Sequence, residues 1–332
     1  MASEALEKTL SEARGLSLRQ IAEKKIHHAG DRFVNPFNAG GHGGLGRLLR
    51  WKLFSENKFR DQYKDEVVRE IRLDWRKFTE EGDCALMFMR HASLAVRDMD
   101  RVLLVDPVFS GIFTIKDFSP IVSGLDDMPP PDHVLITHGH YDHLHVPTLE
   151  TLDPGTHVVT PLGYDAIFED LGMHNRTRLD WFQEFRDGGL TVTLLPCSHW
   201  TMRNPFTGPN RSLWGSYLLQ GASGRTIYVS GDTGYFDRFG EIGREWDIDL
   251  AVISLGAYEP RWFMRESHLN PEEAVRAFRE LGAKQVLVVH WGTFRLGDEP
   301  VHLPPLEMRK EMKKAGCEDR LIMLEHGQTL IL

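Results

Sequence analysis

From Cys84 to the C-terminus, the chain is a succession of short apolar runs separated by polar, glycine- and proline-containing stretches. Runs of this length that are rich in valine, isoleucine and leucine are typical of buried β-strands. The strands predicted in this way are 85–89, 102–105, 134–137, 157–160, 190–195, 216–219, 226–230, 250–253, 286–289 and 320–324. Helical patterns are found at 163–171, 270–281 and 304–315. We therefore predict one strand-rich domain over residues 83–332.

The first 82 residues lack this pattern and are predicted to form a helical and loop-like extension that packs on the main domain. Residues 4–30 have a mostly polar helical pattern, and residues 45–81 are amphipathic and charged. The stretch AGGHGGLG lacks the Gly-Lys-Ser/Thr of a phosphate-binding loop, so we interpret residues 33–46 as a flexible linker. The extension shows no obvious apolar stretch for docking on a membrane.

Potential metal ligands follow the predicted strand 134–137, in the run HGHYDH. Four of them, His138, His140, Asp142 and His143, lie within six residues. Burying them without partners would be costly, and a plain surface turn, the competing interpretation, gives them no reason to cluster. If the backbone stays extended, His138 and His140 point to the same face and can bind one metal ion. Asp142 and His143 follow a turn and would face a second position.

Three more polar residues, His199, Asp232 and His290, each come just after another predicted strand. Open α/β sheets place their ligand crevices outside the carboxyl ends of the strands. Taken singly, His199 or His290 is more often a hydrogen-bonded histidine than a ligand. Together with HGHYDH, however, the seven residues predict two metal ions that share Asp232 as a bridge. Histidine combined with carboxylate suits zinc, and also iron or manganese, so we expect two divalent ions, with zinc preferred.

The motifs now allow a comparison with known families. HxHxDH, followed by a histidine, a GDT aspartate and a last histidine, resembles the metallo-β-lactamase fold superfamily of binuclear hydrolases. The sequences WGSYLL, SGDTGYF, GAYEPRWFM, HLNPEEAV and HWGTF are similar to the N-acyl phosphatidylethanolamine-hydrolysing phospholipase D family. The resemblance runs from about Phe33 to the C-terminus and is strongest between Leu213 and Phe294.

This resemblance implies an α/β (α+β) chain folded as a four-layer αββα sandwich, with a two-metal site. It also implies a phospholipase D-like phosphodiesterase that cleaves N-acyl phosphatidylethanolamine-type lipids to phosphatidic acid and an N-acylethanolamine. One motif departs from the superfamily pattern. Many members carry a Gly-His-Ala turn in the first hairpin, whereas this chain has Arg90-His91-Ala92. Because arginine disfavours positive φ, we expect no tight left-handed turn there.

Three residues are assigned to catalysis. The resemblance places a functional histidine at His268, which is our candidate to supply a proton to the leaving alkoxide; a surface histidine beside a helix cap is the competing interpretation. Asp106 ends a predicted strand and either fixes the tautomer of a metal-bound histidine or forms a turn before Pro107. Asp142 is assigned to both catalysis and metal binding.

Substrate contacts are predicted in the run GAYEPRWFM. Arg261 is the candidate for binding a phosphate group, and Trp262 and Phe263 are the candidates for contacting acyl chains. With Met264 they would form the wall of an apolar groove leading to the metals. Plain packing is the alternative for all of these side chains.

Composition restricts the partners. At 332 residues, with 41% hydrophobic and 26% charged residues, the chain has the composition of a globular protein with a sizeable core. A net charge of −9 argues against nucleic acid and against purely electrostatic docking on anionic lipid. We find no apolar run long enough for a membrane span and no apolar core of a secretory signal. The three scattered cysteines argue against a disulfide framework. We therefore expect a cytoplasmic protein, whose contact with membranes would be peripheral.

Three functions compete at this point. The leading one is the lipid phosphodiesterase, and the second is a metal-dependent lactonase or phosphodiesterase acting on a small soluble substrate. The third is a non-enzymatic protein that keeps a metal site for structure. The presence of all seven ligands and of His268 argues against the third. A requirement for micelles or vesicles would separate the first two.

Overall fold

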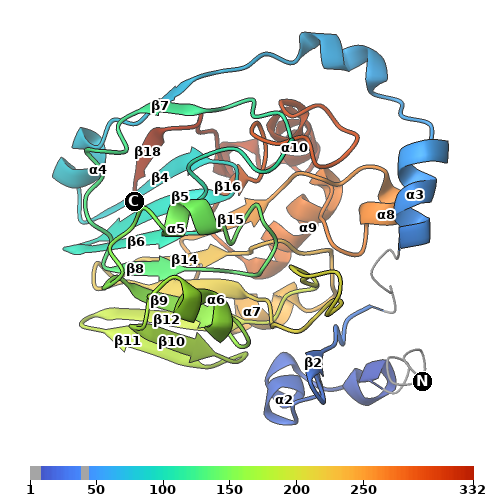
Figure 1. Ribbon diagram of the computed structural model, residues 1–332, viewed down its shortest axis with the longest axis horizontal. Coiled ribbons are helices and arrows are strands. Elements are labelled where there is room, and N and C mark those ends of the chain that lie inside the picture. Colours follow the sequence, from blue (N-terminus) through green and yellow to red (C-terminus); the bar gives the residue numbers. More distant parts are fainter. Residues whose placement is uncertain (1–8, 39–44) are drawn as a thin grey trace.

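Two seven-stranded sheets dominate the computed structural model, which describes residues 9–38 and 45–332 (Figure 1). The first sheet contains, in order, β10 (Arg176–Leu179), β9 (His157–Pro161), β8 (His133–Leu135), β6 (Arg101–Val105), β5 (Ser93–Asp98), β4 (Cys84–Arg90) and β18 (Gln328–Ile331). The second contains β11 (Glu184–Asp187), β12 (Leu190–Leu195), β13 (Ser216–Gln220), β14 (Thr226–Val229), β15 (Leu250–Ser254), β16 (Gln285–Val289) and β17 (Leu321–Ile322).

The sheets lie between two helical layers. In β4, Leu86 and Phe88 pack in the core shared with the second sheet, whereas Met87 and Met89 pack on the other face with the outer helices. The helices on the outer face of the first sheet are α4 (Arg76–Glu80), α5 (Val146–Leu149) and α6 (Asp165–Asp170). Those on the second sheet are α7 (Phe239–Glu245), α9 (Pro271–Leu281) and α10 (Leu303–Lys314). This is the expected αββα sandwich (Figure 1).

Helix α9 follows the loop that carries His268 and begins and ends at sequence signals. Asn270 accepts a hydrogen bond from the Glu273 backbone N–H, and the Glu273 side chain accepts one from the Asn270 N–H. Pro271 occupies the first turn, where its missing N–H is not needed. The helix ends at Gly282, whose φ of 64° is left-handed. The predicted start of this helix is therefore confirmed, and it fixes the end of the loop.

Four strands of the large sheets were not predicted because polar residues interrupt their apolar pattern. Strand β5 is fully buried although it contains Arg97. The Arg97 guanidinium donates hydrogen bonds to the carbonyls of Phe78, Glu81, Gly82 and Met99, so its N–H groups have partners within the protein. Strands β10 and β11 lie at sheet edges and are largely polar, and β18 follows the last predicted strand. Apolar runs alone identify central strands better than edge strands.

The described part of the N-terminal segment differs from the predicted long helix. Helix α2 (Leu18–Glu23) is followed by a small hairpin of β1 (His28–Ala29) and β2 (Arg32–Phe33), so the prediction of helix up to residue 30 was wrong. The first part of that helix, residues 4–8, and residues 39–44 of the predicted glycine-rich linker lie outside the described residues. The remaining elements are α3 (Leu45–Phe54), η1 (Arg60–Asp65), β3 (Ile71–Arg72) with its partner β7 (Ile121–Ser123), α8 (Arg261–Met264) and η2 (Glu318–Arg320).

Helix α3 gives the extension an exposed apolar surface that the sequence pattern did not reveal. It leaves Leu48, Leu49, Leu53 and Phe54 exposed, the last at 80% of its surface. Trp51, on the other side, is buried against the main domain. The sequence concealed this surface because lysine and arginine alternate with the apolar residues, so that no continuous apolar run stands out.

Two predictions from composition can be compared with the structure. Within the described residues, no helix combines the length and the apolar character that crossing a bilayer requires. The three cysteines, Cys84, Cys197 and Cys317, are all free and buried, which confirms that they form no disulfide framework.

Candidate metal centre

The predicted ligands come together where strands of both sheets end. HGHYDH follows β8, His199 follows β12, Asp232 follows β14 and His290 follows β16. Because β8 lies beside β6 in one sheet and β14, β15 and β16 are parallel neighbours in the other, their carboxyl ends share one edge of the sandwich. Each ligand is thus carried by a short loop on a buried strand, which fixes its position.

A first group of donor atoms comes from His138, His140, His199 and Asp232, all within 4.8 Å of one another. Nδ1 of His140 lies 2.9 Å from Nε2 of His138 and 3.2 Å from Nε2 of His199. Asp232 Oδ2 lies 3.9 Å from His138 Nε2 and 4.0 Å from His199 Nε2. Gly139 makes the approach possible, because a Cβ there would lie 2.7 Å from Thr201 Oγ1.

A second group lies on the other side of Asp232. The Oδ2 atom of Asp232 is 3.3 Å from His143 Nε2 and also 3.3 Å from His290 Nε2. Oδ2 of Asp142 is 3.2 Å from His290 Nε2 and 3.6 Å from His143 Nε2. Asp232 is therefore within ligand spacing of both groups, as expected for a bridging carboxylate. The structure separates His138 and His140 from Asp142 and His143 in the way that the extended-then-turn interpretation predicts.

These donors fit divalent metal ions. Ligand atoms about 2.1 Å from a tetrahedral zinc ion lie roughly 3.3 Å from one another, close to most of the spacings above. Two buried atoms, Nε2 of His143 and Oδ1 of Asp232, have no hydrogen-bond partner. An orphaned buried polar atom is costly unless a ligand satisfies it. A cation at each group would meet these unpaired atoms.

The first group is electrostatically prepared for a cation. Burial lowers the pKa of His138 and His199 well below the usual range, and neighbouring histidines lower it further. Burial also lowers the pKa of His140 to about 4. All three imidazoles are therefore neutral near pH 7, which is the form that binds metal.

In the second group the carboxylates dominate. Burial opposes protonation of His143, but Asp232 and Asp142 outweigh it and raise the pKa of His143 well above its usual range. In the same way Asp232 and Asp142 raise the pKa of His290 to about 9. In the absence of a metal ion, protons on these imidazoles compensate the negative charges of Asp142 and Asp232. A bound metal cation would replace the protons in this role.

Asp106 contacts a predicted ligand rather than only forming a turn. Its Oδ2 lies 2.7 Å from Nδ1 of His143 and accepts from Oγ1 of Thr137 at 2.6 Å, while Oδ1 accepts from the Thr137 N–H at 2.7 Å. A carboxylate on Nδ1 leaves Nε2 of His143 free to face the other donors. Thr137 was not singled out from the sequence.

Left-handed backbone conformations gather at this edge. Asp106, His91, Ala257 and His290 have φ values of 44°, 48°, 54° and 68°. Such values are uncommon outside glycine, and clusters of them occur at functional sites. The expectation of no left-handed residue in the first hairpin was therefore wrong: His91 adopts it, one position after the arginine. The carbonyl of His91 accepts a 2.6 Å hydrogen bond from the His290 N–H, which stabilises that conformation.

His91 is the residue that sequence reasoning missed. Its side chain is fully buried, and Nε2 lies 2.9 Å from Oδ2 of Asp142. Burial and, to a lesser extent, the neighbouring His290 together lower its pKa to about 3. A histidine in a hairpin turn between two apolar strands was the available signal.

His268 lies beside the centre without joining either group of donors. Nδ1 is 3.8 Å from Oδ2 of Asp232, and the side chain is 15% exposed, so it borders both the predicted ligands and the solvent. Burial lowers its pKa to about 4, so the ring is neutral near pH 7 and carries one N–H. This position allows contact with a substrate bound at the centre; its catalytic role stays a prediction.

Arg261 supports the loop of His268. Its guanidinium donates to the carbonyls of His268 at 2.9 Å and Tyr258 at 3.2 Å, and it pairs with Glu273 at 2.6 Å. These contacts engage both terminal nitrogens, and the phosphate-binding role of Arg261 stays a prediction.

The neighbouring aromatic residues receive helix α3. The ring of Phe263 packs 5.1 Å from that of Trp51, and Trp262 Nε1 donates to Ser55 Oγ at 3.1 Å. Met264 is buried in the same small cluster. These residues therefore form a base for α3, and their contact with a substrate stays a prediction.

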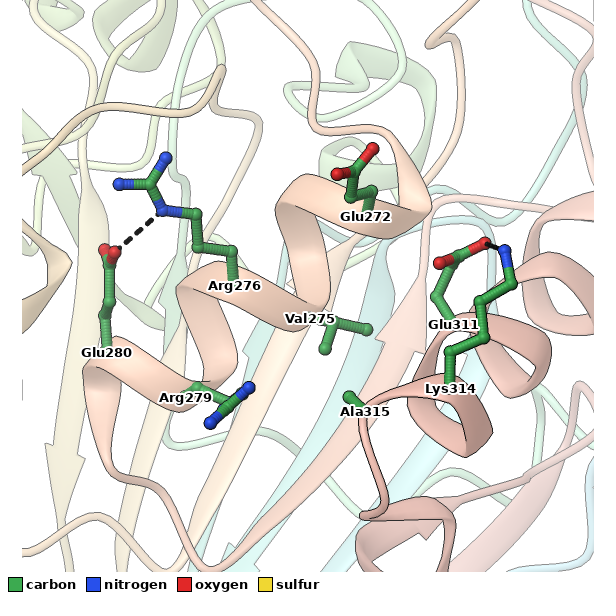
Figure 2. Close-up of a pocket in the computed structure, with 8 residues that line it drawn as sticks. All are labelled: Glu272, Val275, Arg276, Arg279, Glu280, Glu311, Lys314 and Ala315. Carbon is green, nitrogen blue, oxygen red and sulfur yellow. Dashed lines mark hydrogen bonds and ion pairs between the residues drawn. The ribbon is translucent and has the colours of Figure 1, made fainter.

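Two pockets differ in their relation to the site. One of about 210 Å³ borders HGHYDH. Its lining residues are Gly111, Ile112, Phe113, Tyr141, Leu144, His145, Val146, Pro147 and Arg203. Another of about 580 Å³ lies between α9 and α10 (Figure 2). There Arg276 pairs with Glu280 and Lys314 with Glu311, and none of the seven predicted ligands lines it, so we assign no chemistry to it.

Comparisons with known proteins agree with this geometry. A model described as a β-lactamase superfamily domain matches residues 101–291. N-acyl-phosphatidylethanolamine-hydrolyzing phospholipase D 1 of Caenorhabditis elegans is 32% identical over 315 residues, which cover 86% of this chain and 87% of that protein. The mitochondrial N-acyl-phosphatidylethanolamine-hydrolyzing phospholipase D of Saccharomyces cerevisiae is 30% identical over 241 residues, which cover 68% of this chain and 51% of that protein.

Solved structures support the fold. A possible metal-dependent hydrolase from Veillonella parvula superposes with a TM-score of 0.64 at 17% identity, covering 76% of this chain and all of that one. At this identity the likeness concerns the fold alone. The matching family model and the sequence relatives, together with the histidine–aspartate centre, show that the protein is a metal-dependent hydrolase. The chain belongs to the N-acyl phosphatidylethanolamine-hydrolysing phospholipase D family of the β-lactamase superfamily.

Proposed function

We propose that this protein is a two-metal phosphodiesterase that cleaves N-acyl phosphatidylethanolamine-type lipids on the head-group side of the phosphate, releasing phosphatidic acid and an N-acylethanolamine. The observation that carries the proposal is the shared position of Asp232, within 3.3 Å of His143 and His290 and 4.0 Å of His199. One carboxylate between two sets of donors is the arrangement that a pair of metal ions requires. The lipid substrate follows from the names of the relatives.

Bound divalent ions would supply a water-derived nucleophile at neutral pH and neutralise charge on the phosphate. His138, His140 and His199 would hold one ion, Asp142, His143 and His290 the other, and Asp232 both. The chain's own contribution is to keep these donors fixed. Asp106 holds His143 by its Nδ1.

His268 would assist the leaving group. A neutral imidazole with one N–H, 3.8 Å from Asp232, can donate a hydrogen bond or a proton to the oxygen that departs with the N-acylethanolamine. Arg261 would hold that loop in place through the His268 carbonyl.

Helix α3 offers a surface for the lipid. Leu53 and Phe54 are 67% and 80% exposed, and Arg50 and Lys52 are exposed beside them. An amphipathic helix with basic residues next to exposed apolar ones is typical of contact with a membrane interface. The helix lies beside α8, whose Arg261 reaches His268, so a lipid held there would be close to the catalytic loop (Figure 1).

The proposal also divides the chain at residue 82. Residues 1–82 would form the extension that carries the lipid surface, and residues 83–332 the catalytic domain. A cytoplasmic location, peripheral at the membrane, stays a prediction.

The decisive experiment compares substrates. N-acyl phosphatidylethanolamine in mixed micelles should be cleaved faster than lactones or short-chain phosphodiesters, because each buried CH₂ of the tail contributes about 0.8 kcal/mol. Dominant turnover of a lactone, or no effect of tail length, would leave only the metallohydrolase.

A second experiment addresses the surface. Phe54→Ser should weaken binding to vesicles that contain anionic lipid. Leu306→Ser, at an exposed residue of α10, serves as a matched control and should not. Equal binding by both variants would remove α3 from the proposal.

A further inference from the structure

The turn between β4 and β5 brings a histidine from the first sheet into the metal centre. His91 is fully buried, and its ring centroid lies 4.1 Å from that of His290. Strand β4 belongs to the first sheet, whereas His290 follows β16 of the second. His91 thus crosses between the two sheets at the edge where the predicted ligands meet.

Two backbone contacts anchor His91 in this place. The His290 N–H donates to the His91 carbonyl at 2.6 Å, and the His91 N–H donates to Oγ1 of Thr293 at 2.9 Å. The residue also forms an isolated antiparallel bridge with Trp291. The turn and the loop that carries His290 are therefore held as one unit.

The side chain acts on a second ligand. Nε2 of His91 lies 2.9 Å from Oδ2 of Asp142, the oxygen that also faces His290 Nε2 at 3.2 Å. A carboxylate oxygen has two lone pairs, so it can accept this hydrogen bond and still bind a cation. The bond fixes which oxygen is turned toward the other donors.

The number of donors distinguishes this contact from direct ligation. Four other donors already complete a tetrahedral set, and Asp142, His143, His290 and Asp232 are spaced by 3.2 to 3.6 Å. That range agrees with the spacing of roughly 3.3 Å expected around zinc, so His91, which lies within 4.8 Å of Asp142, His143 and His290, would be a fifth donor.

We infer that His91 is a positioning residue of the metal centre, which orients Asp142 through Nε2 and holds the backbone of His290 without binding the metal itself. The inference rests on the proposed two-metal function for the identity of the ligands. It requires no particular substrate.

The test uses two variants that differ in reach. The side-chain amide of His91→Gln can place an N–H close to the position of Nε2, whereas His91→Asn is too short to do so. His133→Gln is the control, because His133 is also buried and bonded to an aspartate, Asp187, but lies at the opposite end of β8. Each protein is loaded with zinc or cobalt(II), and its metal content and the competition with a chelator are measured.

His91→Gln and His133→Gln should keep wild-type affinity for both ions. His91→Asn should bind one of the two ions about 10- to 100-fold more weakly. The cobalt(II) absorption bands of the two His91 variants should keep the shape of the wild type, since no ligand is exchanged. Wild-type affinity in His91→Asn would overturn the inference.

Equal losses in both His91 variants, together with altered cobalt(II) bands, would instead make His91 a ligand and would also overturn it. Circular dichroism establishes that each variant is folded. If His91→Asn does not fold, the test rests on His91→Gln, which should retain metal as wild type does. Release of metal from His91→Gln more than about 10-fold faster than from wild type would then count against the inference. These readouts involve no lipid, so they would be unchanged if the proposed substrate were wrong. A wild-type protein that binds a single ion would instead show that the two-metal proposal is wrong.

Discussion

Two clusters of histidine and aspartate in this molecule have similar composition and different physics. The metal centre gathers the five histidines and two aspartates predicted as ligands, with His91 as a sixth histidine beside them. The N-terminal cluster consists of His27, His28 and Asp180, and it joins the β1 hairpin to the loop between β10 and β11. Residue types alone would mark both as metal sites.

Spacing separates them. In the N-terminal cluster, Asp180 lies 2.6 Å from His27 Nε2 and 2.8 Å from His28 Nε2, and Lys25 Nζ lies 2.7 Å from the same carboxylate. These are hydrogen-bond lengths, shorter than the roughly 3.3 Å between ligands of one zinc ion. A lysine at the carboxylate also repels a cation. The metal centre has mostly wider spacings, and its unpaired buried atoms include Nε2 of His143, which faces other donors, and Oδ1 of Asp232. The unpaired buried atom of the N-terminal cluster is Nδ1 of His27, the ring nitrogen that does not contact Asp180.

The contrast teaches that a metal site is recognised by what its donors leave unsatisfied. In the N-terminal cluster the carboxylate is already compensated, and His27 stacks on Trp181 at 4.0 Å between ring centroids. Such a cluster stabilises the attachment of a segment. In the metal centre, the polar groups of Asp232 and His143 gain full partners only when a cation is present. The comparison leads to four predictions, in decreasing order of expected effect.

Asp232→Ala should remove at least one metal ion and nearly all hydrolysis, because Asp232 lies within 4.0 Å of donors in both groups. Elemental analysis of the purified variant and of the wild type, which should bind about two ions per chain, measures the loss. A folded and fully active variant, or a fully active wild type with at most one ion, would contradict the two-metal model.

His268→Ala should keep the metal content and lower the rate. His268 belongs to neither group of donors, and general acid–base assistance is typically worth about 10²- to 10⁴-fold. Metal analysis and turnover are measured on the same preparation. Lost metal would make His268 a ligand or a support, whereas an unchanged rate on all substrates would remove its catalytic role.

The candidate ligands of the metal centre could be predicted from the sequence. HGHYDH marks four candidate ligands because they are contiguous, and His199, Asp232 and His290 each follow an apolar run. Strand ends in a sandwich converge, so the convergence of these residues could be expected. The assignment of the ligands stays a prediction that the experiments above address.

The rest depends on contacts that a pattern does not contain. His91 and Asp142 are 51 positions apart and meet only because two sheets pack together. Strand β5 escaped prediction because the charge of Arg97 is satisfied by carbonyls distant in sequence. The exposed face of α3 escaped it because basic residues alternate with Leu48 and Leu53. Long-range hydrogen bonds and exposure are properties of the fold.

Asp180→Asn should destabilise the protein and leave its metal content unchanged. The substitution removes the counter-charge of the half-exposed Lys25 and replaces one of the two acceptor oxygens that face buried His27 and Lys25 by an NH₂ donor, which we expect to cost about 3 kcal/mol. Urea denaturation of metal-loaded protein measures the free energy of unfolding. A third ion in the wild type that is absent from the variant would break the comparison, because the N-terminal cluster would then be a metal site.

The last prediction concerns pH and His27. Burial lowers the pKa of His27 below its usual 6.5, although Asp180 partly opposes this effect. The unfolded chain therefore binds a proton at His27 before the folded protein does, so stability is lost as pH falls from about 6.5 toward the folded pKa. His27→Gln keeps a side-chain N–H and does not titrate. The stability of wild type relative to this variant should fall between pH 7 and 5, by at most about 1.4 kcal/mol per pH unit.

The pKa of Asp180 is also held below its usual value, because its hydrogen bonds to His27 and Lys25 outweigh burial. Its contribution is present above the unfolded pKa of about 3.9 and is lost only in stronger acid, so the two effects separate on the pH axis. Chemical denaturation at saturating metal between pH 7 and 5 isolates the histidine. A stability of wild type that rises relative to His27→Gln as pH falls through about 6.5 would mean that His27 is already protonated in the folded state. The N-terminal cluster would then be a permanent ion pair rather than a neutral imidazole bonded to a carboxylate.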